Sequence, residues 1–161
     1  MAELIKVGMA DYKVGSSPDT LISYGLGSCV GIALFDPIAK VGGLSHIMLP
    51  DSSSARLVEN PAKFADSAIP LMLNDILRLG GNKTRLWAKI AGGAQMFTFA
   101  NTMEIMRIGD RNTDAVISIL RELNIPLLGR DTGGNYGRTV ELKLDIGIFR
   151  VKTIAKGEKD L

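Results

Sequence analysis

Segments with strand character occupy both ends of this chain, and segments with helical character lie between them. Apolar or β-branched runs separated by turn residues predict strands at 3–14, 20–24, 29–35, 44–49, 85–90, 126–131, 138–144 and 148–154. Apolar residues recur at helical spacing from Ala65 to Leu77 and again over 112–123. This order favours a mixed α/β layered sandwich over a regular succession of βαβ units.

The length and charge of the chain limit the classes of function. At 161 residues it fits a single domain, 1–161, of which the polar tail 156–161 is expected to fray. The 19 basic and 17 acidic residues give a net charge of +2, which favours neither nucleic acid nor an anionic membrane as a partner. The sequence shows no signal peptide and no apolar run long enough to span a bilayer, so no membrane insertion is predicted. A cytoplasmic protein with one free thiol is therefore expected.

The single cysteine, Cys29, and the single histidine, His46, lie on the two arms of a predicted hairpin. A turn centred on Pro37 and Ile38 would pair residues whose numbers sum to 75, which places Cys29 directly opposite His46 on one face. A thiolate nucleophile and its general base need this arrangement, with a neighbouring imidazolium stabilising the thiolate near neutral pH. Taken alone, each residue also fits a plainer interpretation, a small buried thiol and a satisfied core histidine.

Residues near Cys29 supply the other parts of such a site. Glycines at 25, 27 and 31 allow a tight turn beside the thiol, and the backbone N–H groups of Ser28 and Cys29 can point at a developing oxyanion. Gly27 and Ser28 are therefore candidate rim residues. Ser23 is the best local hydroxyl to orient His46, although a serine there can equally satisfy a backbone group.

Two glycine segments at predicted strand ends are candidates for the rest of a substrate rim. They contribute Gly92 and Gly93 from one segment, and Gly133, Gly134 and Asn135 from the other. Such loops gather around one site in a layered α/β fold, and ordinary turns are the alternative. The tripeptide beginning at Asp131 matches that of aspartic proteases, but it occurs once and that chemistry needs two carboxylates. One cysteine, one histidine and no carboxylate cluster do not favour a metal site.

Four ordered runs in this sequence resemble those of the CheD family of chemotaxis proteins. They are residues 24–29, 44–51, 89–94 and 131–135, and the resemblance extends from about residue 4 to residue 150. It implies a three-layer mixed α/β sandwich, similar to cysteine deamidases of the cytotoxic necrotizing factor type. The implied activity is that of a protein-glutamine glutaminase, which converts chemoreceptor glutamines to glutamate and releases ammonia. Cys29 would be the nucleophile, His46 the base and Ser23 a third catalytic hydroxyl, where family members often have threonine.

The same resemblance implies particular partners. They are the cytoplasmic domain of a chemoreceptor and, in many species, a CheC-type phosphatase that acts on phosphorylated CheY. The reaction requires no metal or organic cofactor. The alternative is a non-catalytic regulatory module that binds the CheC-type phosphatase, and the presence of Cys29 and His46 favours catalysis over it. A thiol redox sensor is disfavoured, since no second cysteine is present to resolve a sulfenic acid.

Overall fold

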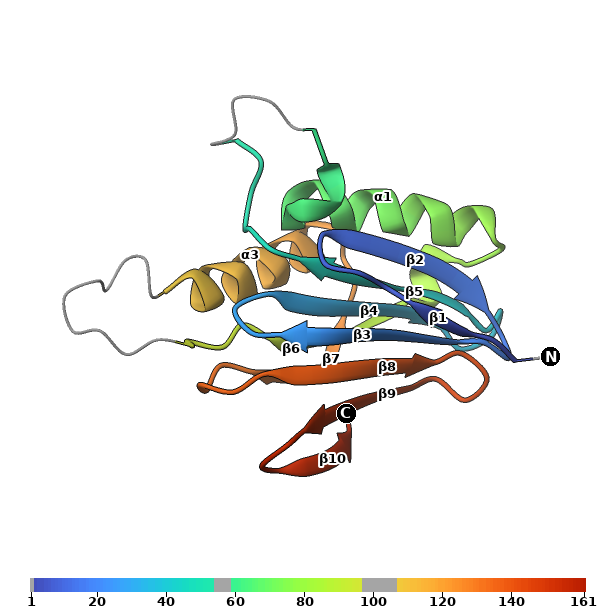
Figure 1. Ribbon diagram of the computed structural model, residues 1–161. Helices are drawn as coiled ribbons and strands as arrows, with labels where there is room; N and C mark the ends of the chain where they lie inside the picture. Colours follow the sequence, from blue (N-terminus) through green and yellow to red (C-terminus); the bar gives the residue numbers. More distant parts are fainter. Residues whose placement is uncertain (1, 54–58, 97–106) are drawn as a thin grey trace.

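The computed structural model describes residues 2–53, 59–96 and 107–161, which form two stacked β-sheets with helices on one side (Figure 1). The helix-side sheet has the strand order β2-β5-β4-β6-β7, and the outer sheet has the order β1-β3-β8-β9-β10. The strands are β1 (Leu4–Lys6), β2 (Asp11–Ser16), β3 (Thr20–Leu26), β4 (Val30–Asp36), β5 (Val41–Ile47), β6 (Trp87–Gly92), β7 (Leu127–Thr132), β8 (Arg138–Lys143), β9 (Ile148–Thr153) and β10 (Gly157–Asp160). The helices are α1 (Ala65–Arg78) and α3 (Ile108–Glu122), with 3-10 turns at Pro61–Lys63 and Lys83–Arg85. The predicted three-layer mixed α/β sandwich is confirmed.

Two apolar cores join the three layers. One lies between the helices and the helix-side sheet and includes Ile69 and Met72 of α1, and the other lies between the sheets and includes Leu21 and Phe149. Strand β4 is buried at every position because its side chains alternate between the two cores. Burying one such large apolar side chain stabilises the fold by about 1.5 to 3 kcal/mol. The segment that begins at Cys29 therefore continues into a strand fixed on both faces.

Helix α3 begins at Ile108, earlier than the predicted start at residue 112. The first turn contains Gly109, which has low intrinsic helix propensity and hides the start of the helix from a periodicity argument. A Cβ atom added at Gly109 would lie 2.4 Å from the carbonyl oxygen of Ala94. A glycine at this position thus lets the helix approach the chain that follows β6.

The hairpin between β4 and β5 has a longer loop than predicted. Asp36 pairs with Val41, so the connection is residues 37–40 and not a turn centred on Pro37 and Ile38. The Asp36 carboxylate accepts the backbone N–H groups of Ile38 and Ala39, at 2.9 and 3.1 Å, and this stabilises the wider loop.

The longer loop shifts the register of the hairpin by two residues. His46 pairs with Gly31, and Cys29, which precedes β4, lies diagonal to His46 instead of opposite it. The predicted direct pairing of Cys29 with His46 is therefore wrong. A shift of two residues preserves the alternation of side chains, so both residues keep the same face, the one toward the outer sheet.

Two expectations about the ends of the chain are also corrected. The predicted strand 3–14 is two strands, β1 and β2, which join different sheets because Ala10 takes a left-handed φ of 55° and redirects the chain. The tail, expected to fray, forms β10 and pairs antiparallel with β9. An ion pair of 2.8 Å between Arg150 and Asp160 links these two strands.

Candidate active site

The three residues predicted to be catalytic come from three neighbouring segments around the layer between the sheets. Ser23 lies on β3 of the outer sheet, His46 on β5 of the helix-side sheet, and Cys29 directly before β4. Ser23 Oγ lies 2.8 Å from His46 Nδ1, and both side chains are buried. Cys29 is buried too and belongs to the core between the sheets. The structure therefore joins Ser23 to His46 and places the thiol in the same layer.

The hydrogen bonds of Ser23 determine which imidazole nitrogen carries the proton. Ser23 Oγ also lies 2.8 Å from the carbonyl oxygen of Val7, which can only accept. The hydroxyl group donates its single hydrogen to Val7 O, so the hydroxyl oxygen accepts a hydrogen bond from His46 Nδ1–H. The lone pair of the neutral ring is then on Nε2, which is buried and has no hydrogen-bond partner among the described residues. An unpaired basic nitrogen in this position is what a general base requires.

Burial keeps both Cys29 and His46 neutral in the resting protein. It raises the pKa of the Cys29 thiol, against a smaller opposing effect of the residue's own backbone N–H. It lowers the pKa of His46 to about 4. The expected imidazolium beside a thiolate is therefore not the resting state, and His46 is available as an uncharged base near neutral pH.

The lowered pKa of His46 predicts a pH dependence of stability. The imidazole has a pKa of 6.5 in the unfolded chain and about 4 in the folded protein, so the unfolded state binds more protons between these values. The contribution of neutral His46 to the free energy of unfolding should be fully present above pH 6.5. About 3 kcal/mol of it should be lost as the pH falls from 6.5 to about 4. Urea titrations at several pH values measure it, and His46→Gln should lack this part of the dependence.

Backbone hydrogen bonds bring together the three glycine-containing segments predicted to form the rim. The N–H groups of Gly93 and Ala94 donate to the carbonyl oxygens of Cys29 and Gly27, each at 2.8 Å. Gly133 N–H donates to Gly92 O at 3.0 Å, and Gln95 N–H donates to Gly134 O at 2.8 Å. Ser28 is half-buried beside the thiol, and Asn135 is exposed on the turn after Gly134. Backbone hydrogen bonds thus link the segments around Gly27, Gly92 and Gly133 next to Cys29, with Gly92 and Gly93 buried.

Gly92 shows why the end of β6 needs glycine. Its φ of +117° suits a residue without a side chain, and an added Cβ would lie 2.2 Å from the carbonyl oxygen of Cys29. The end of β6 consequently packs directly on the backbone of Cys29.

Asn112 of α3 is a site residue that the sequence argument missed. It is fully buried, and its Nδ2 donates to Ser28 O at 3.0 Å and to Met48 O at 2.9 Å. It therefore ties the segment before Cys29 to the segment after His46. A signal was present in the sequence, because position 112 lies on the same helical stripe as the apolar residues Val116 and Leu120.

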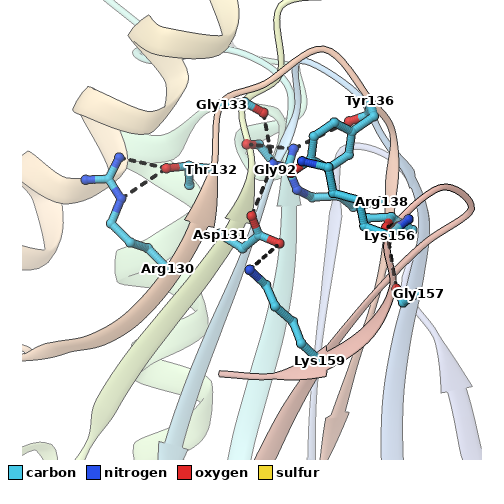
Figure 2. Close-up of polar contacts among 11 residues, drawn as sticks. Gly92, Arg130, Asp131, Thr132, Gly133, Tyr136, Arg138, Lys156, Gly157 and Lys159 are labelled. Atoms are coloured by element: carbon cyan, nitrogen blue, oxygen red, sulfur yellow. Dashed lines mark hydrogen bonds and ion pairs between the residues drawn. The ribbon is translucent and has the colours of Figure 1, made fainter.

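A cavity of about 560 Å³ adjoins the rim between the start of α3 and the end of β7. Its lining is polar and charged and consists of Arg107, Asp110, Arg111, Thr113, Asp114, Arg130, Thr132 and Gly133. Arg130 Nε and Nη2 both donate to Thr132 Oγ1, at 3.0 and 2.7 Å, which holds the guanidinium in place (Figure 2). The cavity thus opens beside Gly133, one of the predicted rim residues.

Comparison with known proteins places this chain in a family. The family described as "CheD chemotactic sensory transduction" matches residues 48–153. The chain belongs to the CheD family. The resemblance stated from the sequence is thereby confirmed.

Several CheD relatives are similar over almost their whole length. A protein of Desulfitobacterium hafniense (strain DSM 10664 / DCB-2) is 52% identical over 99% of this chain and 99% of its own. One of Syntrophomonas wolfei is 51% identical over the same shares. One of Clostridium botulinum (strain Hall) is 52% identical over 98% of this chain and 97% of its own. Each is named "Probable chemoreceptor glutamine deamidase CheD".

Two solved structures are distantly similar to this chain. YfiH of Bacillus licheniformis is 16% identical, with a TM-score of 0.47 over 76% of this chain and 50% of that one. The C-terminal domain of CNFy from Yersinia pseudotuberculosis is 12% identical, with a TM-score of 0.42 over 98% of this chain and 62% of that one.

Two features are absent from residues 2–53, 59–96 and 107–161. No helix in that part of the chain is both long and apolar enough to cross a bilayer. The same residues contain no group of three or more His, Cys, Asp and Glu side chains able to hold a metal ion.

Proposed function

We propose that this CheD-family chain hydrolyses the side-chain amide of particular chemoreceptor glutamines to glutamate and releases ammonia. Relatives at 51–52% identity are named as probable chemoreceptor glutamine deamidases. The observation that carries the chemistry is the Ser23–His46 hydrogen bond, which leaves Nε2 unpaired in the buried layer that also contains Cys29. Since the substrate would be the cytoplasmic part of a receptor, we place the activity in the cytoplasm.

In the proposed first half-reaction, Cys29 is the nucleophile and His46 the general base. His46 Nε2 takes the thiol proton as sulfur attacks the amide carbon of the glutamine side chain, and the carbonyl electrons move to oxygen. His46 then gives this proton to the departing nitrogen, so that the C–N bond breaks, ammonia leaves and a thioester remains. The proton thus moves within one buried pair, which suits two groups that are neutral at rest.

In the second half-reaction water hydrolyses the thioester. His46 takes a proton from water as the oxygen attacks the thioester carbon. The C–S bond then breaks, glutamate leaves, and His46 returns the proton to sulfur to restore the thiol. The N–H groups of Gly93 and Ala94 already donate to backbone carbonyls, so they are committed elsewhere. We therefore assign stabilisation of the oxyanion to the N–H groups of Ser28 and Cys29.

Incubation with a purified receptor cytoplasmic fragment tests the proposed function. Ammonia release, together with mass-spectrometric conversion of specific receptor glutamines to glutamate, would support it. A fragment that stays unmodified at saturating concentration, while binding is demonstrated, would refute catalysis and favour the binding-module alternative. Interaction with a CheC-type phosphatase stays a prediction from the sequence.

Removing the hydroxyl of Ser23 should slow deamidation without abolishing it. Ser23→Ala deletes the acceptor that holds the Nδ1 proton, and one hydrogen bond worth about 1 kcal/mol corresponds to a fall in kcat of about fivefold to tenfold. Ser23→Thr should retain activity because it keeps the hydroxyl. Steady-state kinetics on a receptor fragment measure both.

Ser45→Ala is the matched control for this experiment. Ser45 is the buried neighbour of His46, and its Oγ has no hydrogen-bond partner among the described residues. Its loss should leave kcat unchanged and should not lower the free energy of unfolding. Unchanged kinetics in Ser23→Ala would assign that hydroxyl to the structural bond with Val7 alone.

A further inference from the structure

A network of polar contacts lies behind the glycine rim where the two sheets meet (Figure 2). The Arg138 side chain is 1% exposed and extends from the start of β8 in the outer sheet toward β6 and β7 in the helix-side sheet. Its Nη2 donates to Gly133 O at 2.9 Å and lies 3.3 Å from the carboxylate of Asp131. Its Nη1 lies 3.4 Å from the carbonyl oxygens of Gly92 and Tyr136. We call Arg138, Asp131 and these three carbonyl groups the Arg138 clasp.

Burying the charged guanidinium group of Arg138 between the two sheets costs free energy of desolvation. Its desolvation penalty can exceed the attraction to one carboxylate, and an apolar side chain of similar size would avoid that penalty. Arg138 Nε is buried without a hydrogen-bond partner among the described residues, so the penalty is only partly offset. The Asp131 carboxylate also forms an ion pair with Lys159, whose Nζ lies 3.4 Å from Oδ2. Holding the backbone carbonyl groups of Gly92 and Gly133 in place is therefore a better explanation of the Arg138 clasp than a net gain in the stability of the fold.

The peptide bond between Gly92 and Gly93 connects the Arg138 clasp to Cys29. Its carbonyl oxygen accepts hydrogen bonds from Arg138 at 3.4 Å and from Gly133 N–H at 3.0 Å, while its N–H donates to Cys29 O at 2.8 Å. Because the peptide unit is planar, fixing the direction of the carbonyl fixes the direction of the N–H. A charged donor on the carbonyl also polarises the unit and strengthens the bond that the N–H makes.

We propose that Arg138 is a positioning residue for Cys29 and sets the direction of the nucleophile's backbone through the Gly92–Gly93 peptide. It acts through two glycines whose side-chain positions are filled by neighbouring backbone or by Thr113, so the chain there has little room to adjust. The inference rests on the role of Cys29 in the proposed function. Its test therefore includes a reaction of the thiol that needs no receptor.

Arg138→Lys is the variant that tests this role. It keeps a positive charge near Asp131, but an ammonium group cannot form the guanidinium fork to two carbonyl groups. We expect kcat for ammonia release to fall about tenfold to a hundredfold, with KM changed by less than about threefold. Alkylation of Cys29 by iodoacetamide, without receptor, should slow about tenfold near neutral pH and recover at high pH, where hydroxide replaces His46 as the base.

Arg150→Lys is the matched control, since it makes the same exchange on the neighbouring strand β9. Arg150 forms an ion pair with Asp160 at 2.8 Å, and its side chain is 28% exposed. Both kcat and the alkylation profile should match the wild type in this variant. A general sensitivity of the outer sheet to arginine replacement would instead affect both variants alike and would overturn the proposal.

Two results in folded Arg138→Lys would also overturn it. One is wild-type kcat with a wild-type alkylation profile. The other is faster alkylation at every pH, because Arg138 would then only keep the protein closed around the thiol. If Arg138→Lys does not fold, the double variant Arg138→Met/Asp131→Asn removes both charges of the buried pair together. The same losses are expected of it, and wild-type values would refute the proposal.

The two readouts also separate this proposal from the proposed function. A wild-type protein that releases no ammonia refutes deamidation, whereas the alkylation profiles still decide the role of Arg138. Normal deamidation with an unchanged profile in the variants refutes the role of Arg138 alone.

Discussion

Replacing Cys29 by alanine should abolish ammonia release from a receptor fragment, with a fall in kcat/KM of more than about a thousandfold. The chain contains no second cysteine that could act instead. The fold should survive, because the backbone carbonyl of residue 29 still accepts the N–H of Gly93 and only one buried sulfur atom is lost. Circular dichroism and urea unfolding of the same preparation would establish that the loss is chemical.

The partner of Cys29 in this reaction can be tested with the same assay. His46→Ala should cause a comparable loss, and the double variant should be hardly worse than either single one, since the two groups act as a unit. Independent, additive losses would show that His46 does not serve Cys29. Turnover by Cys29→Ala near the wild-type rate would mean that the nucleophile has been assigned to the wrong residue.

Replacing Gly92 by alanine should be the most damaging change of a single small side chain. The added Cβ would lie 2.2 Å from Cys29 O and 3.2 Å from the Cα of Val30, and both atoms belong to backbone that cannot rotate away. Strands β4 and β6 would have to separate at the proposed nucleophile. We expect the free energy of unfolding to fall by about 3 kcal/mol and kcat to fall about a hundredfold, because small displacements of reacting groups cost large factors in rate.

Gly80→Ala separates the effect of the steric contact with Cys29 O from the effect of placing alanine at a positive φ. Gly80 has a φ of +101°, close to the +117° of Gly92, but an added Cβ there would meet no atom within 4 Å. It should lower the free energy of unfolding by about 1 to 2 kcal/mol and leave kcat unchanged. Equal effects of the two variants would show that the contact with Cys29 O is unimportant.

The fold and the face shared by Cys29 and His46 could be predicted from the sequence because they depend on local patterns. Alternation and turn residues locate the strands, and a shift of two residues does not change which face a side chain occupies. The register itself could not be predicted, because it depends on Asp36, which is buried and held by Arg85 at 2.9 Å and by the N–H of Asn82 at 2.8 Å. Although burial raises the pKa of Asp36, the hydrogen bonds to Arg85 and to backbone N–H groups outweigh it and lower the pKa to about 2.

The supporting residues of the site were hidden for a different reason. A strand that begins with arginine ordinarily indicates a solvent-exposed position, and nothing local shows that Arg138 points between two sheets. In the sequence, Asp131 is notable only as part of a tripeptide that matches a protease motif, whereas in the structure it is the carboxylate beside Arg138. Contacts between segments far apart in the chain decide such roles, and periodicity within one segment does not report them.

Peroxide oxidises thiolates and spares thiols, so the protonation state of a resting nucleophile decides how long it survives. The raised pKa of Cys29 leaves little thiolate near neutral pH, and no second cysteine is present to trap a sulfenic acid as a disulfide. In the proposed mechanism, His46 accepts the thiol proton as the sulfur attacks the glutamine side chain. Burial in the layer between the sheets thus favours the thiol form of Cys29, which should react slowly with peroxide when no substrate is bound.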